Sequence, residues 1–127
     1  MIRWLAGLVV VLFIASAGLA EEKLTEAAAK TKNERLKVKA SVDWDKQFLR
    51  ECLAELVSEI NDKGLGKIEI KYDAAGGVSM NTRMTYTTKD KTVGEILDEF
   101  LSANDLKYTI ISKKGDKTDG GLLIKKK

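Results

Sequence analysis

Apolar residues recur at helical spacing over residues 43–64 of the chain. They lie at i, i+4 and i+8 with flanking neighbours and form one wide apolar face, made of Phe48, Leu49, Cys52, Leu53, Leu56, Val57 and Ile60. Asp43 or Asp45 is expected to cap the amino end of this helix, and Gly64 to end it in a left-handed turn. Burial of such a face contributes on the order of 10–20 kcal/mol, so the helix requires a sheet packed against it.

Alternating apolar and polar residues predict strands on both sides of this helix. Residues 36–44 alternate before it, and residues 67–72 alternate after it. A turn or loop is expected at residues 73–77, followed by a third strand over residues 83–87. Residues 89–91 are then expected to turn the chain.

A second helix is predicted to begin at Thr92, because Thr92 and Glu95 match the capping box. It is expected to run to about Asn104 and to be followed by a strand over residues 106–112 and a short strand over residues 122–124. The order β-α-β-β-α-β-β predicts an α+β fold, a two-layer sandwich in which two helices pack on a small sheet or sheets.

The first twenty residues form a different kind of segment. Arg3 gives a positive start, and the residues that follow are almost entirely apolar or small up to Ala20. We therefore predict a secretory signal peptide over residues 1–20, cleaved after Ala20, with cleavage after Ala17 as a second possibility and an uncleaved membrane anchor as the alternative. Residues 21–35 are interpreted as a flexible polar linker, either a frayed helix or a tether, and residues 36–127 as the folded domain.

The overall composition is that of a globular protein with nearly balanced charge. The 127 residues are 44% apolar and 32% charged, and loss of the signal peptide would lower the formal net charge by one, from +3 to +2. So small a charge does not require a polyanionic partner, and no nucleic-acid partner is expected. The predicted signal peptide indicates an exported protein, which is expected in a periplasm or outside the cell.

Several stretches of the sequence resemble the short N-terminal (STN) domain shared by bacterial secretins and TonB-dependent receptors. The resemblance spans residues 36–124 and rests on the stretches KVKASVDW, FLRECLAELVSEIN, KIEIKYD, TVGEILDEFLSANDLKYTI and GGLLI. It implies a small α/β module that binds another protein of the cell envelope and has no catalysis of its own. The shared motifs are packing patterns, so the resemblance assigns no functional role to any single residue.

Side chains suited to catalysis or metal binding are few. Histidine is absent, which removes the commonest general base and metal ligand. Asp43 and Asp45 lack the spaced oxygen ligands of a calcium loop, and Gly76 and Gly77 lack the following lysine and hydroxyl residue of a phosphate loop. Cys52 is interpreted as a buried core residue, with a reactive thiol as the alternative. We predict no catalytic, metal-binding or cofactor-binding residue.

Three surface features have a structural and a functional interpretation. Glu51, Glu55 and Glu59 share one helix edge, either as a solvated face or as a contact for a basic partner. The lysines near the carboxyl end would form a solvated tail that protects a strand edge, or would bind anionic lipid: Lys113, Lys114, Lys117, Lys125, Lys126 and Lys127. Trp44 would pack under the helix start or serve as an exposed anchor for a partner.

The function favoured by the sequence is that of an exported, non-catalytic protein-interaction module of the bacterial cell envelope. Such a module would offer a sheet edge or the groove beside a helix to another envelope protein. The alternatives are a small hydrolase with a carboxylate site and a binder of anionic membranes or polyanions through the lysine-rich carboxyl end. No stable membrane span is expected after signal cleavage.

Overall fold

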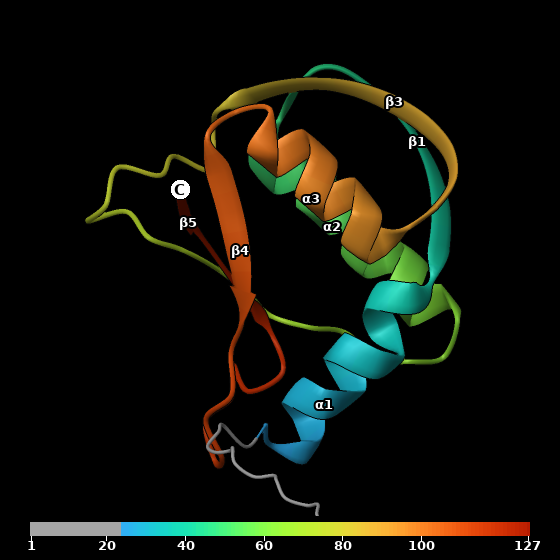
Figure 1. Cartoon of the computed structure of the whole chain (residues 1–127), viewed down its shortest axis with the longest axis vertical. Coiled ribbons are helices and arrows are strands. Elements are labelled where there is room, and N and C mark those ends of the chain that lie inside the picture. The colour runs from blue at the N-terminus through green and yellow to red at the C-terminus, as the bar shows by residue number, and fades with distance from the viewer. Residues whose placement is uncertain (1–23) are drawn as a thin grey trace, which may run out of the picture.

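Residues 24–127 are described by a computed structural model, in which the predicted order β-α-β-β-α-β-β is confirmed (Figure 1). The predicted signal peptide and its predicted cleavage after Ala20 fall outside the described residues. The elements in chain order are α1 (Glu26–Asn33), the 3₁₀ turn η2 (Arg35–Lys37), β1 (Lys39–Phe48), α2 (Leu49–Asp62), β2 (Ile70–Tyr72), β3 (Arg83–Thr92), α3 (Val93–Ser102), β4 (Leu106–Ile110) and β5 (Leu122–Lys126).

The strands form two small sheets. Strands β1 and β3 pair antiparallel as a long ribbon. In the other sheet β5 is central, pairing parallel with β2 and antiparallel with β4. Helices α2 and α3 lie side by side between the ribbon and the β4–β5 strands in Figure 1, so their apolar faces are covered by strands. This is the expected α+β sandwich, with its strands divided between two sheets, and it leaves β2 and β4 as edge strands.

The core joins the two helices to both sheets. On α2 the predicted apolar face is buried at Leu49, Cys52, Leu53, Leu56 and Ile60. Helix α3 begins with the predicted capping box, in which the Thr92 side chain accepts from the amide of Glu95 and the Glu95 carboxylate accepts from the amide of Thr92. The capped end fixes where α3 starts and therefore which of its residues face the core.

Helix α2 begins later than predicted, and neither Asp43 nor Asp45 caps it. Both aspartates lie in β1, which continues to pair with β3 as far as Phe48. The first amides of α2 are satisfied by loop carbonyls instead: Leu49 donates to Thr82 O at 2.8 Å and Arg50 to Met80 O at 3.0 Å. A side-chain cap is unnecessary because the backbone supplies the acceptors. The predicted left-handed turn at the other end is confirmed by the φ of +80° at Gly64.

The turn predicted at residues 89–91 is wrong, because these residues belong to β3. Asp90 has a φ of +52°, and the register of the ribbon shifts between Ala40 and Val42 opposite it. The Asp90 amide donates to Ser41 Oγ at 3.1 Å. Aspartate tolerates this backbone conformation, so the ribbon absorbs the turn-like residues as an irregularity and continues to Thr92.

Helix α1 lies within the segment that the sequence suggested to be a polar linker. The structure has an ordered helix there in place of the expected frayed helix or tether, and it is capped by Thr25, whose side chain accepts from the amide of Ala28. Ala28 and Thr31 are fully buried, and the Thr31 hydroxyl donates to Gly120 O. Only small side chains make this contact, so the apolar periodicity of the sequence did not indicate it.

Candidate functional site

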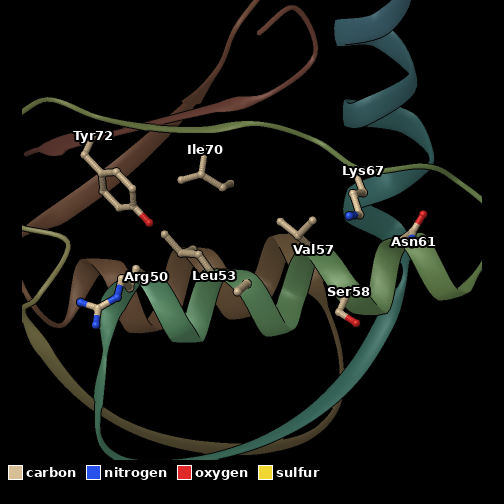
Figure 2. Close-up of a pocket in the computed structure, with 9 residues that line it drawn as sticks. Arg50, Leu53, Val57, Ser58, Asn61, Lys67, Ile70 and Tyr72 are labelled. Carbon is tan, nitrogen blue, oxygen red and sulfur yellow. The ribbon is translucent and has the colours of Figure 1, made fainter. Parts of the chain in front are cut away.

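A groove of about 450 Å³ lies between helix α2 and strand β2, and we call it the α2–β2 groove (Figure 2). Leu53 and Val57 of α2 form its apolar floor together with Ile70 and Tyr72 of β2. Ala54 also lines the groove and is exposed. Its small side chain leaves the space open where a larger residue of α2 would fill it.

Strand β2 is an edge strand, and its residues Ile70 and Tyr72 line this groove. Glu69 O accepts from the amide of Leu122, and the amide of Asp73 donates to Ile124 O, each at 2.9 Å. Hydrogen-bonding direction alternates along a strand, so the backbone groups of Ile70 and Tyr72 point away from β5. The Tyr72 carbonyl accepts from the amide of Ala74 at 2.9 Å, so the groups that remain as a template for an added strand are the amides of Ile70 and Tyr72 and the carbonyl of Ile70.

Polar side chains stand at the two ends of the groove. Arg50 lies at the end nearest Tyr72, and Asn61 and Lys67 lie together at the other end (Figure 2). Burial raises the pKa of Tyr72, and the charge of Arg50 acts in the opposite direction. At neutral pH the Tyr72 hydroxyl is therefore an uncharged hydrogen-bond donor and acceptor beside an apolar floor.

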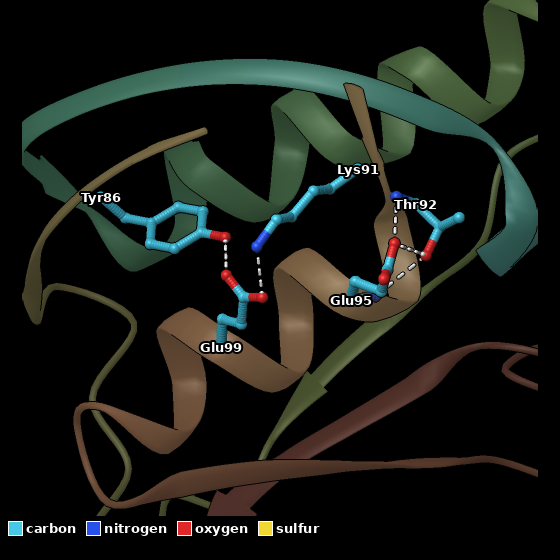
Figure 3. A network of polar contacts seen from close by, with 5 residues as sticks. All are labelled: Tyr86, Lys91, Thr92, Glu95 and Glu99. Carbon is cyan, nitrogen blue, oxygen red and sulfur yellow. Dashed lines mark hydrogen bonds and ion pairs between the residues drawn. The ribbon is translucent and has the colours of Figure 1, made fainter. Parts of the chain in front are cut away.

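A second cluster of polar side chains joins β3 to α3 (Figure 3). Glu99 accepts from the Tyr86 hydroxyl at 2.5 Å and pairs with Lys91 Nζ at 2.6 Å. The hydrogen bond from Lys91, followed by that from Tyr86, lowers the pKa of Glu99. Catalysis by a general acid needs a carboxyl group with a raised pKa, so this arrangement favours a structural role over that of a hydrolase acid.

Stability should depend on pH through Glu99. Its folded pKa lies below the ordinary 4.5, so the stabilisation is present above that value and is lost as the pH falls through the folded pKa. We expect the melting temperature of Glu99→Gln to fall less steeply than that of wild type between about pH 5 and about pH 3. Thermal unfolding at a series of pH values measures this slope.

Glu69→Gln is the matched control. Glu69 is exposed and immediately precedes β2, so it takes no part in the β3–α3 contact. It should keep the wild-type slope. A Glu99→Gln slope equal to that of wild type would mean that the Glu99 contacts contribute nothing to acid stability.

Cys52 and Trp44 are core residues, as favoured from the sequence. Cys52 is fully buried, and burial, followed by the charges of Glu55 and Glu51, raises its pKa from 9.0 to about 12. The reactive-thiol interpretation is therefore wrong, since the thiolate is not populated at neutral pH. Trp44 is 1% exposed and contacts Phe100 of α3, which excludes its use as an exposed anchor.

The remaining charged residues do not converge on one site. Glu55 accepts from Gln47 Nε2 at 2.6 Å, and Glu51 is exposed on the same helix edge. Lys125 and Lys126 lie on the central strand β5, with Lys125 directly opposite Lys107, so the expectation that they protect a strand edge is wrong for these two lysines. Within residues 24–127, no three histidine, cysteine or acidic side chains are grouped so as to hold a metal ion.

None of the helices described here is both long and apolar enough to cross a lipid bilayer. Comparisons with family models, curated protein sequences and solved structures find no match to this chain. The STN resemblance therefore rests on the sequence stretches and the order of elements alone.

Proposed function

We propose that this protein is an exported, non-catalytic STN-like module of the bacterial cell envelope that binds an extended segment of another envelope protein. The observation that carries the proposal is the free edge of β2 beside the apolar α2–β2 groove. A strand added there pairs with the amides of Ile70 and Tyr72 and the carbonyl of Ile70, and extends the three-stranded sheet to four strands.

The two parts of the site make different contributions to binding. Backbone pairing with β2 supplies affinity that depends little on the sequence of the partner. Every second side chain of the added strand would point toward α2 and meet Leu53 and Val57, which selects apolar residues at alternate positions. Specificity therefore resides in the helix side of the groove.

The groove also has a length that suits a short strand. Arg50 and Asn61 are eleven residues apart on α2, which corresponds to about 16 Å along a helix axis. An extended chain covers this distance in about five residues. The site is therefore matched to a single strand of ordinary length, and side chains at its ends can reach the polar residues there.

Photo-crosslinking in the cells that make the protein tests this proposal. A benzophenone amino acid replaces Ala54 in the groove or, as a matched exposed control, Lys89 on β3 of the other sheet. We expect a discrete adduct from position 54 only. The crosslinked segment of the partner should have a sequence in which apolar and polar residues alternate. Adducts of equal yield at both positions, or none at position 54, would contradict the proposal.

A further inference from the structure

Arg50, which lies at one end of the α2–β2 groove, shares the ring of Phe48 with Arg83 of β3. The guanidinium carbon of Arg50 lies 4.6 Å from the centroid of the Phe48 ring, and that of Arg83 lies 4.4 Å from it. Stacking on an aromatic ring restrains a guanidinium group without neutralising its charge. The end of the groove therefore carries the oriented positive charge of Arg50, and the charge of Arg83 lies on the same ring outside the groove lining.

The hydrogen-bond partners of both arginines are neutral. Arg50 Nη1 donates to Asn81 Oδ1, and Arg83 Nη1 donates to Lys46 O at 3.0 Å. Neither arginine forms an ion pair within the described part of the chain, where the salt bridge joins Lys91 to Glu99. These guanidinium groups retain donors that can bind a carboxylate from outside.

The charges along the groove all have the same sign. Lys67 stands at the end opposite Arg50, and the side chains that line the groove in the described residues include no carboxylate. The arrangement is an apolar floor between two basic ends. Charge complementarity then favours an occupant with acidic side chains near its ends and apolar side chains between them.

We infer that the partner segment is acidic: an extended strand whose carboxylates contact Arg50 at one end and Lys67 at the other. The inference rests on the proposed function, since it names the chemistry of the strand that the groove accepts. A second copy of the chain fits less well. The other free edge of the same sheet, β4, has the sequence LKYTI, which carries Lys107 and no acidic residue.

A pair of isosteric peptides tests the charge preference. The peptides are TETVTVTET and TQTVTVTQT, both acetylated, amidated and dye-labelled, and they are titrated into the full chain in mild detergent. When bound as strands they direct alternate residues toward α2, and their two glutamates lie about 20 Å apart, within reach of the long side chains at both ends of the groove. We expect the acidic peptide to bind roughly three- to tenfold more tightly at low salt, and the ratio to approach one at high salt.

Two variants locate the effect. Arg50→Gln removes a charge but keeps a good helix former, so it should reduce the preference for the acidic peptide. Lys89→Gln removes the same charge from an exposed position of β3 and should leave the preference unchanged. Equal affinity for both peptides would overturn the acidic preference and leave the groove intact as a binding site. Binding of neither peptide, or self-association that excludes both, would overturn the preference together with the proposed function.

Discussion

Replacing Phe100 by alanine is expected to lower the free energy of unfolding by about 3–5 kcal/mol. Phe100 is 1% exposed. The centroid of its ring lies 5.0 Å from that of Trp44, in an edge-to-face arrangement, and 6.0 Å from that of Tyr86. The side chain therefore connects α3 with both strands of the β1–β3 ribbon. Its loss removes aromatic contacts and leaves a cavity that the surrounding helices and strands fill only in part.

Urea unfolding measures this effect, and Phe100→Leu serves as the control. Leucine retains most of the buried apolar volume, so its expected cost is about 1–2 kcal/mol. Both variants lack the aromatic ring, so the difference between their free energies of unfolding measures the effect of the cavity alone. A cost below about 1 kcal/mol for Phe100→Ala would mean that the ring does not join the helix to the ribbon.

Gly121→Ala is expected to destabilise the protein by about 2–3 kcal/mol and to weaken binding in the α2–β2 groove. A Cβ atom at position 121 would lie 2.3 Å from Glu69 O and 2.9 Å from Thr118 O, both backbone atoms. Glu69 O also accepts the hydrogen bond from Leu122 that holds β2 against β5. Relief of the clash has to move β2, and the groove beside it would change shape.

The control for this substitution is Gly94→Ala. A Cβ atom there has ordinary contacts, the nearest being Leu36 O at 3.4 Å, and Gly94 lies in the first turn of α3. Alanine favours the helix over glycine by up to about 1 kcal/mol, so this variant should be neutral or more stable. Thermal unfolding and the peptide titration compare the two variants directly. Unchanged stability of Gly121→Ala would contradict the close approach of β2 and β5.

The sequence predicted the elements whose signal is local. Apolar periodicity identified α2, and the capping box located the start of α3 at Thr92, because both signals reside in neighbouring residues. The end of β1 was missed because it depends on pairing with β3, and the cap of α2 was missed because loop carbonyls supply it. Contacts between distant segments of the chain leave little trace in a local pattern.

The sequence predicted the type of binding site but not its position in the fold. A groove beside a helix or a sheet edge was expected, but which strand would be free depends on β5 entering the sheet between β2 and β4. Arg50 and Arg83 were not singled out, since their common contact with Phe48 joins residues on separate elements. Ala54 offered a weak signal, as a small residue among larger ones on the exposed side of α2.

Amide hydrogen exchange at β2, with and without the bound segment, tests the central claim most directly. The amides of Ile70 and Tyr72 point away from β5 and should exchange rapidly in the free protein and slowly in the complex. The amide of Lys71 faces β5 and should be protected in both states, which makes it an internal control. Saturating binding that leaves the Ile70 and Tyr72 amides as exposed as before would contradict the addition of a strand at this edge.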